Sequence, residues 1–143
     1  MNSNNHIDAW VIILTEYLFI LLPFIVIGIV KTYSADFRGF IEAPDWSFAA
    51  AILFGQLLVK LVSGSLIHQK VIWQRVSLLI ALILVFGLIP SLTTLTLILI
   101  SEGKSSFVIY AQVFLFVVAS ILFFILGSAA QSMIENSEKK KPK

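Results

Sequence analysis

The chain has 143 residues, of which 59% are apolar and 13% charged, and its formal net charge is +2. Average globular proteins are about half apolar and a quarter charged. This composition argues against a soluble globular domain. The absence of cysteine also excludes a disulfide framework and thiolate chemistry.

Four continuous apolar runs occupy residues 10–30, 46–66, 76–100 and 107–130. Each is long enough to cross a hydrocarbon core as a helix, which takes about 20 residues. Because the runs do not alternate with polar residues, they predict helices rather than barrel strands. The sequence therefore predicts an all-α polytopic membrane protein. We expect four transmembrane helices in an antiparallel bundle, forming a single membrane domain over residues 1–143.

The first run contains one charge, Glu16, and one proline, Pro23. A charged group costs about 2.5–3.5 kcal/mol at the centre of a membrane helix. Pro23 frees the carbonyl of Phe19 and is either a hinge or an ordinary proline of a membrane helix. The loop over 31–45 mixes apolar and charged residues and is expected to lie along the interface. We expect Asp45 to cap the second helix.

The second run contains Lys60, about six residues from the end that would lie beside the start of the first helix. Glu16 and Lys60 therefore lie about 9 Å inside the same face. This placement predicts a Glu16–Lys60 ion pair, and Gln56, one turn from Lys60, is expected to hydrogen-bond to it. The pair is either structural, with Lys60 also able to snorkel to the headgroups, or part of a transport pathway. The structural interpretation is favoured because neither later run contains a second acidic residue.

A row of small residues, Ser47, Ala51 and Gly55, recurs at four-residue spacing on the second helix. Such a row allows another helix to approach closely. On a helical wheel it lies nearly opposite Gln56 and Lys60, so this helix should sit between two neighbours. The row serves either packing within the bundle or self-association, and we favour self-association.

The segment 68–75 is expected to extend a helix into the headgroups. In the third run, Pro90 predicts a kink or hinge and frees the carbonyl of Phe86. Nearby groups that could satisfy this carbonyl are at Gly87, Ser91, Thr93 and Thr94. A tight turn over 102–104 leads into the fourth run, whose sparse polar residues include Gln112 and Ser120.

A basic, disordered tail is predicted over residues 136–143, with four lysines at Lys139, Lys140, Lys141 and Lys143. It suits anionic lipid or an acidic patch on a cytoplasmic protein, and it also serves simply as a positive-inside anchor. Placing both termini in the cytoplasm puts six Lys and Arg residues inside and three outside. The positive-inside rule therefore favours a multi-pass protein of the cell membrane with both termini cytoplasmic.

The sequence predicts no enzyme, cofactor, metal site or direct nucleic-acid binding. The two histidines, His6 and His68, lie outside the apolar runs, and no phosphate loop or nucleophile elbow is present. Two functions remain open. One is an oligomeric membrane-embedded subunit that anchors or signals to a cytoplasmic protein partner. The other is an oligomeric ion channel or small transporter that uses Glu16, Gln56 and Lys60.

Four spans, short loops and a basic tail resemble small four-helix inner-membrane proteins of bacterial anti-phage operons, such as the membrane subunit of the Kiwa system. The resemblance covers the whole chain and concerns architecture alone. It implies an oligomer that works with a cytoplasmic nucleic-acid-binding or effector protein. It transfers no functional residue to this chain.

Overall fold

The computed structural model describes residues 3–67, 73–100 and 105–138. Over these residues every regular element is a helix, and four helices are long and apolar enough to cross a membrane. The all-α prediction with four candidate spans is thereby confirmed. The elements are α1 (Ser3–Tyr33), α2 (Phe37–Ile41), α3 (Asp45–Ile67), α4 (Trp73–Ile83), the π-helical turn η1 (Leu84–Leu88), α5 (Ile89–Ile100) and α6 (Ser106–Glu138).

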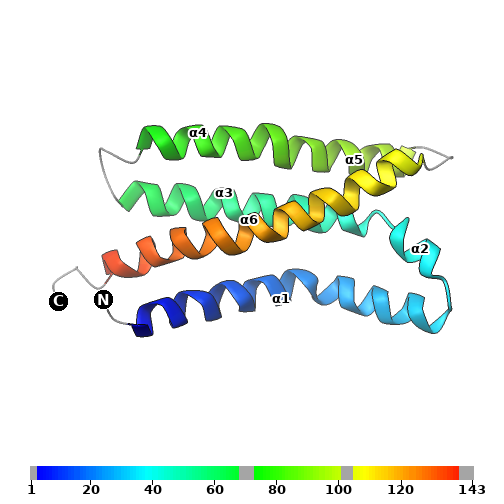
Figure 1. The fold of residues 1–143 in the computed structure, drawn as a ribbon, viewed down its shortest axis with the longest axis horizontal. Helices are drawn as coiled ribbons and strands as arrows, with labels where there is room; N and C mark the ends of the chain where they lie inside the picture. The colour runs from blue at the N-terminus through cyan, green and yellow to red at the C-terminus, as the bar shows by residue number, and fades with distance from the viewer. Residues whose placement is uncertain (1–2, 68–72, 101–104, 139–143) are drawn as a thin grey trace.

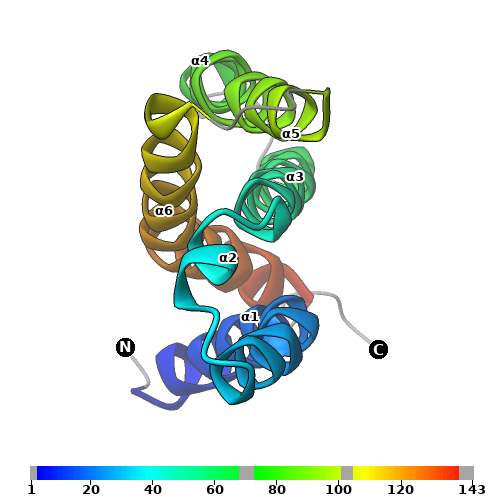
Figure 2. The ribbon, with the colours of Figure 1, turned by 90° about the vertical axis from the view of Figure 1, so that its right-hand side faces the viewer.

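The start of α1 and the end of α6 lie at one end of the molecule, which we call the terminal end, and α2 lies at the other (Figure 1). In the end-on view, α3 lies among α1, α6 and the α4–η1–α5 helix (Figure 2). In the 18-residue apolar window of the span that includes α3, 56% of the residues are buried, against 6% in the corresponding window of the first span. The second span is therefore the centre of the fold.

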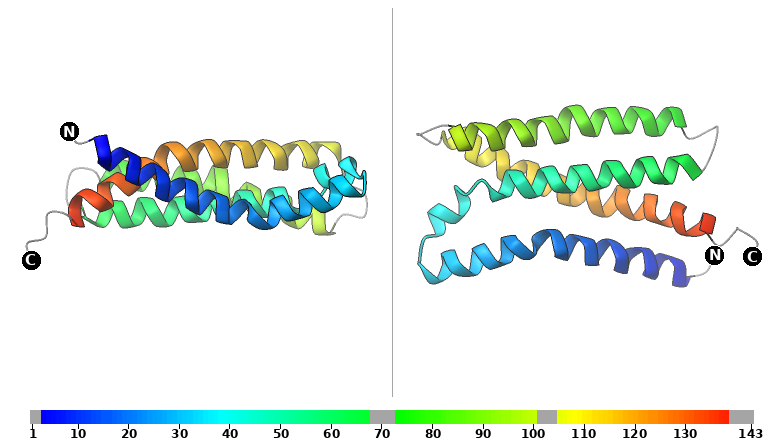
Figure 3. Two further views of the ribbon diagram at one scale, coloured as in Figure 1. Left: turned by 90° about the horizontal axis from the view of Figure 1, so that it is seen from below. Right: turned by 180° about the vertical axis from the view of Figure 1, so that it is seen from behind.

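Helix α6 crosses the other long helices obliquely. It passes from α5 at the α2 end to α1 at the terminal end (Figure 3) and contacts α3 between them. Apolar side chains from three helices fill this crossing, and the fully buried ones include Ile13, Leu53, Leu57 and Phe123. This packing gives α1, α3 and α6 fixed faces toward one another.

The third span contains a π-helical turn, η1, which ends two residues before Pro90. The sequence predicted a kink here with hydroxyl groups near the carbonyl of Phe86. Instead, the Ser91 hydroxyl donates to the Gly87 carbonyl at 2.8 Å, and Thr94 donates to the carbonyl of Pro90 at 2.8 Å. Pro90 has no backbone N–H to donate, and the wider π-helical turn accommodates this loss while the helix continues.

Several predicted boundaries were wrong. Helix α6 continues to Glu138, so residues 136–138 belong to the helix and not to a disordered tail. Asp45 is the first residue of α3 and not its cap. Hydropathy marks where a helix is apolar, not where its backbone hydrogen bonds stop. Pro23 lies inside the uninterrupted helix α1. The segment 68–72, the turn at 102–104 and the lysines of the tail lie outside the described residues.

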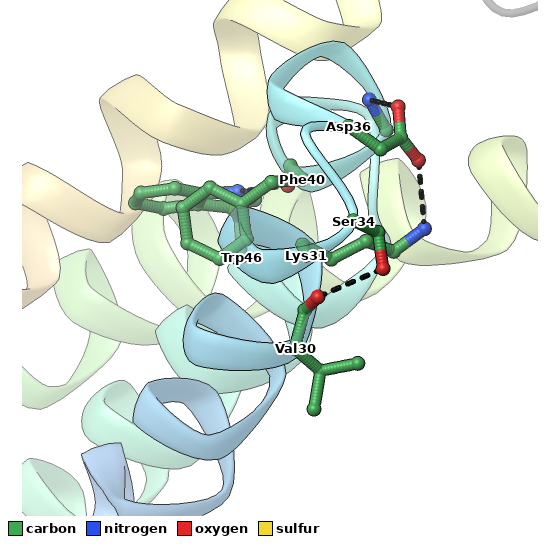
Figure 4. A network of polar contacts seen from close by, with 7 residues as sticks. Val30, Lys31, Ser34, Asp36, Phe40 and Trp46 are labelled. Carbon is green, nitrogen blue, oxygen red and sulfur yellow. Dashed lines mark hydrogen bonds and ion pairs between the residues drawn. The ribbon is translucent and has the colours of Figure 1, made fainter.

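A short connector built around α2 joins the first two spans (Figure 4). The Asp36 carboxylate caps α2 by accepting from the Gly39 backbone N–H at 2.9 Å, and it pairs with the Lys31 ammonium at 3.0 Å. The Trp46 indole N–H donates to the Phe40 carbonyl at 3.0 Å. These contacts fix the start of α3 against the end of α1.

Candidate functional site

A buried polar cluster joins three helices around the ammonium group of Lys60. Its Nζ donates to Glu16 Oε1 of α1 at 3.0 Å and to Gln131 Oε1 of α6 at 2.9 Å. The structure thus brings together the predicted Glu16 and Lys60. Lys60 turns toward α1 and α6 rather than snorkelling along its own helix.

The two charged partners differ in their access to the surroundings. The Lys60 side chain is 10% accessible, whereas the Glu16 side chain is 39% accessible. Glu16 Oε2 is buried and lies 2.9 Å from Lys60 Nζ, but no described residue donates to it with hydrogen-bond geometry. Oε1 therefore accepts the directed hydrogen bond, and Oε2 contributes electrostatic attraction at close range.

Small residues on α3 and α6 allow this close arrangement. A Cβ added at Gly127 would lie 3.2 Å from the Ile13 Cδ1 atom, and one added at Gly64 would lie 3.3 Å from the Ala130 carbonyl oxygen. Larger side chains at either position would separate α6 from its neighbours. The helices would then no longer hold Gln131 within reach of Lys60.

Gln56 does not belong to the cluster, contrary to the prediction. Its side chain is exposed, and Lys60 is contacted by Gln131 instead. Residues four apart on a helix differ by about 40° in direction. On α3 this difference places Lys60 on the buried side of the surface boundary and Gln56 on the exposed side.

The predicted row of small residues is used only in part. Ser47 and Ala51 are buried within the chain, and the Ser47 hydroxyl lies 3.4 Å from Gln112 Oε1. A Cβ added at Gly55 would meet no atom within 4 Å. The row therefore packs inside the protomer at one end and faces open space at Gly55.

Two further polar contacts tie α6 to other elements. Gln112 is fully buried, and its Nε2 donates to the Ile41 carbonyl at the end of α2 at 2.7 Å. The Tyr17 hydroxyl of α1 donates to Ser120 Oγ at 3.1 Å. With Gln131, the fourth span therefore contributes a polar partner at three levels.

The polar contacts of α6 are too far apart to form a continuous path within one chain. Gln131 lies about 16 Å along the helix from Ser120, and Ser120 about 12 Å from Gln112, at 1.5 Å per residue. A hydrogen bond spans only about 3 Å. The intervening core contains fully buried Phe123 and Leu57. Among the described residues, the cluster is therefore suited to holding helices together rather than to relaying protons.

Gln131 was missed because it follows the apparent end of the fourth apolar run. The position of Gln131 along its helix could have indicated the contact, since it lies at the same end of the molecule as Lys60.

Comparison of the chain with known protein families, with curated proteins and with solved structures finds no match. The described residues also contain no group of three His, Cys, Asp or Glu that could hold a metal ion.

Proposed function

We propose that the chain is a multi-pass protein of the cell membrane, with four antiparallel spans and both termini in the cytoplasm. Large apolar side chains are exposed along every long helix, including Phe19, Phe86, Leu99, Phe114 and Ile125. Soluble monomers rarely expose contiguous apolar surface on this scale. Lipid is the environment that accommodates it without a further protein layer.

Within that membrane protein, we propose that the chain acts as an oligomeric subunit that anchors a cytoplasmic protein partner. The observation that favours such a structural subunit over a transporter is the Lys60 cluster, in which one ammonium group is shared by Glu16 and Gln131. An ion pair within one chain, with a nearly buried ammonium group beside an apolar core, favours a structural role over a transport role. The architectural resemblance extends the proposal to bacterial phage defence, with the partner as the effector.

Co-expression with the neighbouring genes, followed by purification in detergent, tests the subunit role. We expect a cytoplasmic protein to co-purify at a fixed stoichiometry. A chain that purifies without any such protein from cells that express it would contradict the proposal. Removing the four lysines of Lys139–Lys143 should weaken the association if the partner binds the tail through an acidic patch.

The second candidate function is an oligomeric channel. It is supported by the partial accessibility of the Glu16 side chain, which could face a shared pore between copies. Ion flux into liposomes distinguishes the two functions. The subunit proposal expects no flux from the wild type. Flux that disappears in Lys60→Met, but persists in Ser128→Ala at a half-buried position of α6, would support the channel instead.

A further inference from the structure

Gln56 is a polar side chain that the packing of the described residues leaves exposed. It lies midway along α3 (Asp45–Ile67), is exposed, and forms no hydrogen bond with another described residue. In the four-span arrangement proposed above, the middle of α3 lies within the hydrocarbon core. Neither acyl chains nor bulk water can satisfy a carboxamide there, so leaving it unpaired is unfavourable.

Gly55, next to Gln56, is likewise unexplained by packing within one chain. A Cβ added at Gly55 would meet nothing within 4 Å, whereas one at Gly87 would lie 2.6 Å from the Phe54 ring and one at Gly64 would lie 3.3 Å from α6. Glycine makes a helix less stable than alanine does. A glycine that faces open space on a membrane helix is suited to the close approach of another helix.

We propose that a second copy of this chain packs against this surface of α3. We define the α3 outer face as the exposed and half-buried residues Ile52, Gly55, Gln56, Val59 and Ser63. The inference rests on the proposed membrane location and deepens the proposed oligomer, because it names the contact surface. Self-association was expected along the row of small residues. Because Ser47 and Ala51 are buried within the chain, we place the contact on the α3 outer face instead.

The chemistry of Gln56 identifies the occupant. Copies inserted with the same topology can be related by a twofold axis along the membrane normal, which places each residue near the axis beside its own counterpart at the same depth. A carboxamide carries both donors and an acceptor, so two Gln56 side chains can hydrogen-bond to each other reciprocally. Gly55 lets the two backbones approach closely enough for this contact.

The absence of cysteine from the chain makes a direct test simple. Val59→Cys places a single thiol on the α3 outer face, one turn from Gly55. Ile121→Cys places a matched thiol on the exposed surface of α6, at a similar distance from the α2 end. In native membranes under mild oxidation, we expect Val59→Cys to form a disulfide-linked dimer and Ile121→Cys to remain monomeric. Equal cross-linking of the two variants, or none from Val59→Cys, would overturn the inference.

A second measurement tests the residues that carry the contact. Energy transfer between labelled copies in vesicles, at a series of protein-to-lipid ratios, gives the dissociation constant. Removing the interhelical hydrogen bonds in Gln56→Leu should weaken dimerisation about tenfold, and Gly55→Leu should do so by blocking approach. Unchanged association in both variants would overturn the inference.

Membrane extraction with alkaline carbonate separates this inference from the proposal beneath it. If the wild type resists extraction yet Val59→Cys gives no dimer, only the α3 contact is wrong. If the wild type is extracted, the proposed membrane location is wrong, and the α3 contact inferred from it is wrong as well.

Discussion

The ammonium group of Lys60 depends on two acceptors from two other helices, and each acceptor has a different chemical character. Glu16 supplies a charge from a partly accessible side chain, and Gln131 supplies a neutral carbonyl oxygen. Removing either acceptor leaves the cation buried with less compensation. The resulting loss of folding stability depends mainly on the buried charge that remains, rather than on the hydrogen bond that is lost.

Replacing Glu16 by Gln should destabilise the protein more than the double change Glu16→Gln and Lys60→Met. The single variant leaves a buried cation without its counter-charge, at a cost of about 1–3 kcal/mol, whereas the double variant removes both charges. Reversible unfolding in mixed micelles measures both free energies. Additive effects of Glu16→Gln and Lys60→Met would show that the two residues are not coupled in the folded protein.

Replacing Gln131 by Leu should destabilise the protein by about 1–3 kcal/mol, because Lys60 loses a charge-assisted hydrogen bond while remaining buried. The matched control is Ser128→Ala, one turn earlier on α6, where an exposed hydroxyl donates to the Ile125 carbonyl of its own helix. We expect the control to change stability by less than about 0.5 kcal/mol. Thermal unfolding in detergent compares the two, and similar values would argue against a role for Gln131.

At the scale of elements, the contact between α3 and η1 depends on one glycine. A Cβ at Gly87 would lie 2.6 Å from the Phe54 ring, which is itself almost fully buried. Because neither helix can move away without disturbing the core, the site tolerates no larger side chain. The Phe54 ring therefore packs directly against the backbone of η1 at Gly87.

Gly87→Ala should destabilise the protein by about 1–3 kcal/mol through overpacking. Gly55→Ala makes the same chemical change on open surface and should be neutral or slightly stabilising in the detergent-solubilised monomer. Thermal unfolding of both variants provides the comparison. If Gly87→Ala unfolds like the wild type, the ring of Phe54 must have another position available to it.

The positions of the charged residues along their helices could be predicted from the sequence. A rise of about 1.5 Å per residue is enough to place Glu16 and Lys60 at one depth. The direction of Gln56 could not be predicted in the same way. It lies about 40° from Lys60 around α3, and only the positions of α1 and α6 decide which of the two residues is covered.

The structure around Pro90 and the end of the fourth span depend on information that hydropathy lacks. A proline removes one backbone donor, and either a kink or a π-helical turn can accommodate that loss. The polar residues after Ala130 continue the helix because its backbone hydrogen bonds carry on beyond the apolar run. Gln131 enters the site for this reason, and the apolar pattern alone gives no indication of it.

At the scale of the whole molecule, the two ends of the helices should face different compartments. Lys and Arg residues are twice as numerous in the segments expected at the terminal end, six against three, and positively charged flanks are retained in the cytoplasm. A fluorescent protein fused to the C-terminus should therefore fluoresce, and alkaline phosphatase fused there should be inactive. Active phosphatase at that position would show the reverse topology.

The distance in sequence between Glu16 and Lys60, 44 residues, has a consequence for biosynthesis. During translation the first span emerges with its carboxylate long before the ammonium group is made. Entering lipid alone, that span would carry a charge without its counter-ion. In the membrane location proposed above, the pairing therefore favours release of the first two spans from the insertion machinery together, as a helical hairpin. The cluster is completed only when the last span brings Gln131 into place.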